Sequence, residues 1–306
     1  MRKLVNQVLK IPYGIFNFLA YRGFFNWIPD KPYLKIQYKA FFGCKLNLDN
    51  PKTFNEKIQW LKLHDRNSLY ITMSDKFAVK EYIREKLGKD YVIPLIGGPW
   101  KNADEINFDE LPNQFVLKCT HDSGGLVICR DKNTLDKKAA KKILNKSLSK
   151  NYFYWCREWA YKDIKPLIIA EKYMEDSNSS ESKMKQCLTD YKFYCFNGKV
   201  KYLYVSVGLE NHKTARISFL TPDWKFAPFN RSDYIPYDKL PEKPHNYSKM
   251  IEIAEYLSKG IPFLRVDLFE LNKNIYFSEF TFYPCGGFMP VIPNEWDKKL
   301  GELLIL

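Results

Sequence analysis

The sequence predicts an α+β protein whose sheets are largely antiparallel. Residues 190–207, DYKFYCFNGKVKYLYVSV, alternate apolar and polar positions around an Asn-Gly pair, the signature of a tight β-hairpin. Residues 263–284, FLRVDLFELNKNIYFSEFTFYP, predict a second hairpin, with Asn272, Lys273 and Asn274 at its turn. Helix signals lie mainly in the first half, and hairpins dominate the C-terminal two thirds.

Composition indicates a globular chain in the cytoplasm. With 306 residues and 45% hydrophobic content, it can bury a core as one large domain or as several lobes. Its seven cysteines are odd in number and scattered without a C-x-x-C motif, so neither a disulfide framework nor a structural zinc site is expected. Polar residues interrupt the apolar stretch at the N-terminus, which predicts neither a signal peptide nor a membrane-spanning helix.

Residues 1–50 form a basic and aromatic arm. They carry eight Lys and Arg against two Asp, and so contribute +6 to the net charge of +13. This composition suits the inner face of an anionic membrane or an acidic partner. The alternative is a helical cap whose lysines lie in solvent. No helix-turn-helix, zinc-finger or RNP-like pattern is present, so nucleic acid is not an expected partner.

The remaining elements follow in order. Thr53 and Glu56 form a capping box for a helix over 54–64, and Ser74 is expected to cap a helix that stops at Gly88. Thr134 is expected to cap a third helix. Strands are predicted at 114–118, 126–129, 166–173 and 216–220, and a further helix at 246–260. The expected divisions are an N-terminal extension (1–50), a helical region (51–110) and two α+β lobes (111–175 and 176–306).

The second hairpin carries two acids. Centred on Lys273, it pairs Asp267 with Glu279, Arg265 with Thr281 and Phe269 with Phe277. Like charges directly across a ladder repel unless one is protonated or a cation lies between them, and a divalent ion with oxygen ligands is the natural candidate. The alternative is a one-residue register slip that leaves two solvated acids on opposite faces. The segment alone does not decide between them.

Several other groups could bind phosphate or a purine. The loop His121-Asp122-Ser123-Gly124-Gly125 could close over a phosphate beside Lys118, or be an ordinary turn. His121 could contact phosphate or simply be solvated. Residues 171–174, EKYM, offer the polar and apolar mixture that a purine needs. Lys192, Arg216 and Arg265 could each brace phosphate, or form salt bridges with neighbouring acids.

Other catalytic signatures are missing. The sequence has no D-x-D triplet, G-x-S-x-G elbow or H-E-x-x-H helix. The missing triplet weighs against many nucleotide-sugar glycosyltransferases.

Five motifs in order resemble the TupA-like branch of the ATP-grasp superfamily. They are PKTFNEKIQWLKLHDRN, SDKFAVKEYI, FVLKCTHDSGG, DYKFYCFNGKV and RVDLFELNKNIYFSEFTFYPCGG, and the resemblance covers about residues 30–290. It implies an ATP-grasp fold in which two α+β lobes of largely antiparallel sheet clasp ATP, preceded by the helical basic extension. Such proteins occur in bacterial clusters for teichuronopeptide, capsule and other surface polysaccharides.

The resemblance also implies roles for individual residues. The phosphates of ATP would be held by Lys118 and by the lid residues Ser123, Gly124 and Gly125. The transferring phosphoryl group would be held by Lys192, Arg216 and Arg265. Asp267 and Glu279 would bind Mg²⁺, with Mn²⁺ as an alternative. Thr281 stands where the superfamily usually has Asn. The expected adenosine contacts are Glu171, Lys172, Tyr173 and Met174, with Glu175 or Asp176 at the ribose.

The implied activity is ATP-dependent carboxylate–amine ligation through an acyl phosphate. Its substrates would be a uronic acid or amino acid on a nucleotide-linked or lipid-linked acceptor, and an amine. A glycosyltransferase, an ATP-grasp kinase and a nucleotide-binding scaffold remain alternatives.

Overall fold

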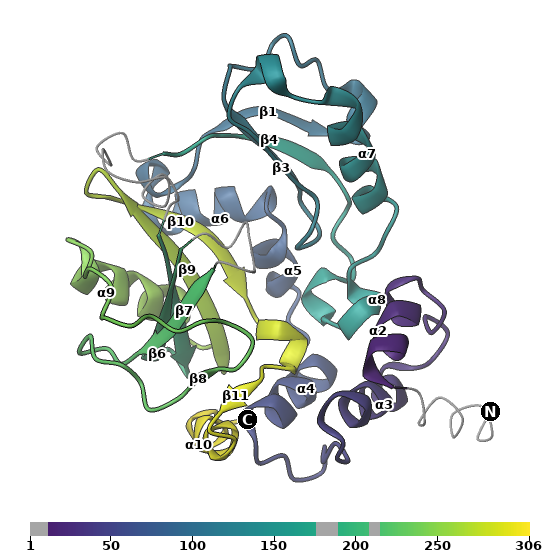
Figure 1. The fold of residues 1–306 in the computed structure, drawn as a ribbon, viewed down its shortest axis with the longest axis vertical. Helices are drawn as coiled ribbons and strands as arrows, with labels where there is room; N and C mark the ends of the chain where they lie inside the picture. Colours follow the sequence, from purple (N-terminus) through teal and green to yellow (C-terminus); the bar gives the residue numbers. More distant parts are fainter. Residues whose placement is uncertain (1–11, 176–188, 208–214) are drawn as a thin grey trace.

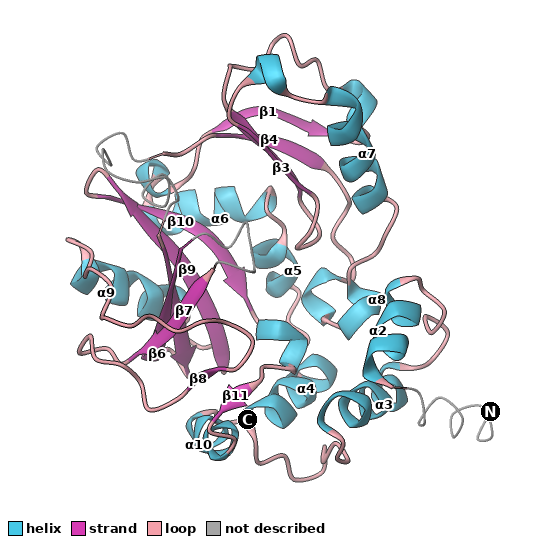
Figure 2. Cartoon of the chain, viewed as in Figure 1, coloured by secondary structure: helices cyan, strands magenta, loops and turns pink. Residues whose placement is uncertain are grey.

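The computed structural model describes residues 12–175, 189–207 and 215–306. Two antiparallel sheets dominate it, a smaller one at the top of Figure 1 and a larger one at the left, with helices between and below them. Helices follow one another in the first part of the chain and antiparallel strands in the later part, which confirms the α+β class (Figure 2). In the part of the chain described, no helix is long and apolar enough to cross a lipid bilayer.

The smaller sheet has the strand order β1-β4-β2-β3. Its strands are β1 (Leu95–Trp100), β2 (Phe115–Cys119), β3 (Leu126–Cys129) and β4 (Ile168–Lys172). Helix α7 (Lys137–Leu148) packs Ala140 and Leu144 against it. Asp136, rather than Thr134, caps α7, because its carboxylate accepts the N–H of Ala139. Strand β1 runs through the Gly97-Gly98-Pro99 sequence, as an edge strand can.

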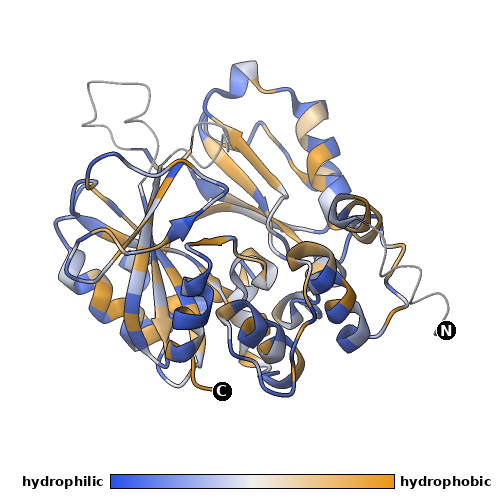
Figure 3. Cartoon of the chain, turned by 60° about the horizontal axis from the view of Figure 1, so that its bottom comes forward, coloured by the Kyte–Doolittle hydropathy of each residue, from blue (hydrophilic) through white to orange (hydrophobic). Residues whose placement is uncertain are grey.

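The larger sheet has the order β10-β9-β5-β6-β7. It comprises β5 (Asp190–Phe196), β6 (Lys199–Val207), β7 (Arg216–Leu220), β9 (Phe263–Leu271) and β10 (Asn274–Thr281). Helix α9 (Tyr247–Leu257) covers one face with the buried residues Met250, Ile253, Ala254 and Leu257. Along such helices, hydrophobic residues alternate with hydrophilic ones (Figure 3), as expected where one side faces a core.

The β9–β10 hairpin pairs the two acids as predicted, but by a different route. Its turn has two residues, Asn272 and Lys273, both at positive φ, so Leu271 pairs with Asn274. Phe269 therefore pairs with Tyr276, and the predicted pairing with Phe277 is wrong. A β-bulge at Ser278 then shifts the register by one residue. Beyond the bulge, Asp267 lies opposite Glu279, and Arg265 opposite Thr281.

Helices α4 (Phe54–His64), α5 (Leu69–Ser74) and α6 (Ala78–Leu87) connect the N-terminal part to the sheets. The capping box of α4 is confirmed: Thr53 accepts from the Glu56 N–H, and Glu56 accepts in return. Ser74 ends α5 instead of capping α6. The Asp75 carboxylate accepts the N–H of Phe77, 2.8 Å away, just before α6 begins.

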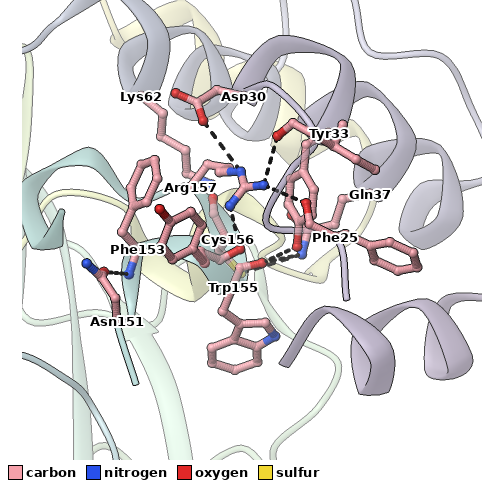
Figure 4. Close-up of polar contacts among 12 residues, drawn as sticks. Phe25, Asp30, Tyr33, Gln37, Lys62, Asn151, Phe153, Trp155, Cys156 and Arg157 are labelled. Atoms are coloured by element: carbon pink, nitrogen blue, oxygen red, sulfur yellow. Dashed lines mark hydrogen bonds and ion pairs between the residues drawn. The ribbon is translucent and has the colours of Figure 1, made fainter. Parts of the chain in front are cut away.

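The first two described helices, α2 (Tyr13–Tyr21) and α3 (Asp30–Phe42), pack on the short helix α8 (Phe153–Cys156). Arg157, 1% exposed, joins them (Figure 4): it donates to the carbonyls of Phe25 and Ile28 at 3.0 Å and lies 3.4 Å from the Asp30 carboxylate. The arm is therefore a packed cap in this region. The chain ends with β8 (Asn230–Arg231), β11 (Val291–Ile292) and α10 (Glu295–Leu303).

Candidate active site

Four charged side chains meet on the larger sheet. Lys192 Nζ lies 2.6 Å from Asp267 Oδ2, and Arg265 holds both oxygens of Asp267 at 2.7 Å. Arg265 Nη2 also donates to Glu279 Oε1 at 2.9 Å. The cation that the paired acids require is thus a guanidinium of the same hairpin. Lys192 reaches Asp267 because β5 and β9 are neighbours and pair these two residues.

The electrostatics of this cluster keep its members charged. Burial alone would raise the pKa of Asp267, which is 0% exposed, but Arg265 and Lys192 outweigh it and hold that pKa below its usual range. Burial would likewise lower the pKa of Lys192, yet Asp190 and Asp267 raise it. Lys192 and Arg265 therefore remain cations, the form that binds phosphoryl oxygens.

A second charged cluster lies on the smaller sheet. The buried carboxylate of Glu171 is held by Lys80 Nζ at 2.5 Å and by Lys118 Nζ at 2.6 Å. Burial opposes its ionisation, but the two lysines lower the pKa of Glu171 to about 2. Lys80 comes from α6, whose Val79 and Ile83 pack in the core of the larger sheet, and it was not predicted, because only the tertiary fold brings it to Glu171. The Glu171 carboxylate thus binds two lysines in this structure.

The two clusters border one narrow space, the inter-sheet cavity, which is lined by Lys76, Lys80, Lys118, Glu171, Ser278 and Glu279 among others. Its volume is about 40 Å³, little more than the share of one water molecule. A nucleotide here requires the two sheets to separate.

Glu279 also borders a second space, the hairpin cavity, of about 540 Å³. Its polar lining includes Glu158, Arg231, Asp233, Arg265, Thr281 and Ser123 from the lid loop. Aromatic side chains from the N-terminal arm and α8 complete the wall, among them Tyr13, Phe41 and Trp155. Glu279 and Arg265 thus stand where a reaction between two bound molecules could occur.

The lid loop between β2 and β3 is held from within. The Asp122 carboxylate accepts the N–H of Gly125 at 3.0 Å and a hydrogen bond from Ser147, and the Asp122 carbonyl accepts from Lys76. The Gly125 N–H is therefore engaged, whereas Ser123 and Gly124 are exposed. A side chain at Gly125 would meet Cys119 at 2.5 Å, which explains the glycine.

The expected adenosine contacts are only partly brought together. Met174 packs with Ile93, Phe269 and Leu271, an apolar patch suited to the face of a ring. Tyr173 instead accepts a hydrogen bond from Arg130, and the backbone N–H of the exposed Lys172 donates to the Pro94 carbonyl. Asp176 lies outside the described residues.

Two predicted contacts lie elsewhere. Arg216 is on the edge strand β7, where it binds the exposed Asp238 at 3.0 Å, so it forms the salt bridge that was the alternative. His121 is neither solvated nor directed at a ligand. It is 2% exposed. Its Nε2 lies 3.3 Å from the carbonyl of Ser147, in the last turn of α7, and 3.1 Å from the carbonyl of Lys150, which follows the helix.

Of the two acids of the hairpin, Glu279 is the one that could bind a magnesium ion. Within the described residues, no group of three or more His, Cys, Asp or Glu could hold a metal by itself. Mg²⁺, however, commonly takes one or two carboxylates together with substrate phosphates. The Glu279 side chain is 41% exposed, and Glu279 and Thr281 both line the hairpin cavity. Asp267 has both oxygens engaged by cations, so it is the less accessible of the two acids.

Two sheets that meet at a lysine-rich space, with an acidic hairpin on one and a glycine-containing loop on the other, define an ATP-grasp protein. The family model TupA-like ATPgrasp matches residues 56–305. The chain belongs to this family.

Comparison with the curated proteins found no match. Among solved structures, the D-alanine–D-alanine ligase of Bacillus anthracis in complex with ATP is similar at 16% identity and a TM-score of 0.39, over 69% of this chain and 55% of that one. The corresponding ligase of Helicobacter pylori has 15% identity and a TM-score of 0.39, over 76% and 63%. An ATP-grasp RimK domain protein of Sphaerobacter thermophilus has 9% identity and a TM-score of 0.37, over 76% of this chain and 67% of that one. The chain thus spans little more than half of the first of these structures.

Proposed function

We propose that this protein is an ATP- and Mg²⁺-dependent ligase that joins a carboxylate to an amine through an acyl phosphate. We further propose that the carboxylate belongs to a uronic acid or amino acid of a bacterial surface polysaccharide. One observation carries the proposal: Glu279 borders both a lysine-lined space and a cavity of about 540 Å³, large enough for a sugar-sized acceptor, and its partner Arg265 lines the second of these.

The chain's own residues suggest how the reaction would proceed. Lys118 would leave Glu171 in part to meet the α-phosphate, while Ser123 and Gly124 present the lid backbone to the outer phosphates. Lys192 and Arg265 would neutralise the phosphoryl oxygens as the substrate carboxylate attacks. Mg²⁺, held by Glu279 with Thr281 and Asp267 nearby, would supply charge neutralisation on the phosphates. Substrates bound in the hairpin cavity would keep water from the acyl phosphate.

The test is to incubate the protein with Mg-ATP, uronic acids and amino acids, and a panel of amines, and to identify products by mass spectrometry. We expect ADP and phosphate to be released together with a conjugate that has lost one water. A stable phosphate ester would indicate a kinase instead. Sugar transfer without consumption of ATP would indicate a glycosyltransferase, and nucleotide binding without any product a scaffold.

We also propose that the N-terminal arm docks on the inner face of the plasma membrane. Ile15, Phe18, Tyr21, Phe24 and Trp27 are each between 49% and 60% exposed. Arg22 and Lys150 lie over the rings of Phe18 and Tyr21, so positive charge accompanies this apolar surface. Such a combination favours anionic lipid.

Flotation with vesicles tests this docking. The wild type is expected to float with phosphatidylglycerol vesicles and much less with phosphatidylcholine vesicles. Replacing Phe18, Phe24 and Trp27 by Ser should abolish flotation. Replacing Phe226 and Ile235, which are 43% and 50% exposed elsewhere, is the matched control and should leave it unchanged. Equal flotation of both variants would rule out the arm as the contact.

A further inference from the structure

The hairpin cavity contains a carboxyl group that the proposed mechanism does not use. Glu158 lines this cavity, and the residue is only 5% exposed. Among the described residues, its carboxylate has no hydrogen bond or ion pair, although its backbone carbonyl accepts the N–H of Tyr161 at 3.0 Å. A buried carboxylate without a partner is costly, and such groups mark functional sites more often than chance.

The nearest cation does not neutralise Glu158 by direct contact. Lys62 directs its three N–H donors to Gln59 Oε1 at 2.9 Å, the Cys156 carbonyl at 2.8 Å and the Gly286 carbonyl at 2.5 Å. Its charge and that of Arg265 act on Glu158 through space. Burial nevertheless outweighs both and raises the pKa of Glu158 to about 7. Near neutral pH this carboxyl can therefore both take up and release a proton.

The backbone beside Glu158 is held in an uncommon conformation. Arg157 has φ 53°, in the left-handed region that a residue with a side chain seldom adopts. Its guanidinium donates hydrogen bonds to the carbonyls of Phe25, Ile28 and Tyr154. On the other side, Glu158 faces Gly286, where an added Cβ would lie 3.6 Å from Oε1. The carboxyl group therefore lies in the cavity wall beside Gly286.

We infer that Glu158 is the proton acceptor for the attacking amine, an inference that rests on the proposed ligase function. A substrate ammonium in the hairpin cavity gives one proton to the Glu158 carboxylate and becomes a free amine. Its nitrogen forms a bond to the carbonyl carbon of the acyl phosphate. The bond from that carbon to the phosphate oxygen breaks, and the electron pair leaves with the phosphate, which takes the second nitrogen proton. Glu158 then releases its proton to solvent.

The test compares two nucleophiles on Glu158→Gln. Hydroxylamine is largely unprotonated at neutral pH and needs no base, whereas ethanolamine is an ammonium ion. With Mg-ATP and a panel of glucuronate, UDP-glucuronate and glutamate, hydroxamate formation reports the acyl phosphate, and amide formation reports amine capture. We expect Glu158→Gln to keep hydroxamate formation within about twofold and to lose amide formation by about 10² or more.

Two further variants exclude a structural explanation. Glu158→Asp keeps a carboxylate and should recover part of the ethanolamine rate. Asp65→Asn removes a half-buried acid that accepts a hydrogen bond from Tyr70 outside the cavity. It should change the rates with the two nucleophiles equally, or leave both unchanged. Equal losses with both nucleophiles in Glu158→Gln, or an unchanged ethanolamine rate, would overturn the inference. If the wild type forms no hydroxamate from any of these carboxylates, the ligase proposal itself fails.

Discussion

Lys80 Nζ lies 2.5 Å from Glu171 Oε1, so a helix residue neutralises the buried acid of the smaller sheet. Lys118 shares that acid from the other side, at 2.6 Å. Three charged groups therefore meet at the inter-sheet cavity. In the proposed mechanism Lys118 turns to a phosphate while Lys80 remains with Glu171.

This balance predicts the effect of Lys80→Met. Without Lys80, the full charge of Glu171 acts on Lys118 and competes with phosphate. The KM for ATP should rise about tenfold, equivalent to about 1.4 kcal/mol, in steady-state assays of ADP release. Lys137→Met is the matched control because Lys137 forms an exposed pair with Asp109, and its KM should match the wild type. An unchanged KM for ATP in Lys80→Met would show that Lys80 does not contribute to nucleotide binding.

Glu171→Gln should show a pH-dependent loss of stability. Removing one partner of a buried ion pair costs about 3 kcal/mol at neutral pH. The folded-state pKa of Glu171, about 2, lies below its ordinary value of 4.5. The ionised acid therefore contributes stability that is complete above pH 4.5 and is lost as the pH falls toward 2.

Urea denaturation of the wild type and of Glu171→Gln across that range measures this dependence. The difference between their free energies of unfolding should close as the pH falls from 4.5 to 2. Glu255→Gln removes an acid from the largely exposed pair with Lys199 and should differ little from the wild type at any pH. If the difference in unfolding free energy between the wild type and Glu171→Gln stays constant from pH 4.5 to 2, the lowered pKa of Glu171 is contradicted.

The two acids of the hairpin should respond differently to neutralisation. Asp267→Asn leaves Lys192 and Arg265 without their buried partner and should cost about 3 to 5 kcal/mol of unfolding free energy as well as turnover. Glu279→Gln changes a side chain that is 41% exposed, so it should abolish turnover at a cost below about 1 kcal/mol. ADP release and urea denaturation on both variants measure this. Full activity in either variant would refute the metal assignment.

The lid loop offers a pair of neighbouring glycines with opposite surroundings. Gly125→Ala places a methyl group 2.5 Å from Cys119 and 2.6 Å from Ser147 Oγ, and should cost about 1 to 3 kcal/mol. Gly124→Ala meets nothing within 4 Å and should change stability by less than about 0.5 kcal/mol. Thermal denaturation compares them. Equal melting temperatures would mean that the loop moves away from Cys119 at little cost.

Local patterns predicted the elements that local chemistry determines. Asn197 and Gly198 form the expected turn with positive φ, and Thr53 and Glu56 the expected capping box, because each depends on neighbours in sequence. The contacts of Lys80 could not be predicted in this way, since α6 carries the same residue pattern whether or not it packs against β4. The same holds for Glu158, which lies in an irregular segment outside any strand or helix motif.

The predicted pairing of Asp267 with Glu279 is confirmed, yet the reasoning behind it made the turn one residue too long, because Asn274 is paired with Leu271. Two deviations compensate: the shorter turn moves the register one way, and the bulge at Ser278 restores it. Arg216 lies far from the acidic hairpin. Sequence order suggested that a late arginine joins the phosphate site, but β7 is the edge of the sheet farthest from β10.

The bulge at Ser278 also gives a rule about parity. In a hairpin with a two-residue turn, paired positions are an odd number of residues apart, as with Leu268 and Phe277 at 277 − 268 = 9. Asp267 and Glu279 are 279 − 267 = 12 apart, an even number. Any relative that keeps this turn and this even spacing must contain an inserted residue between the turn and the acids. In a relative that lacks the inserted residue, the two acids should be an odd number of residues apart. With an even spacing, its second acid would lie on the opposite face of the sheet.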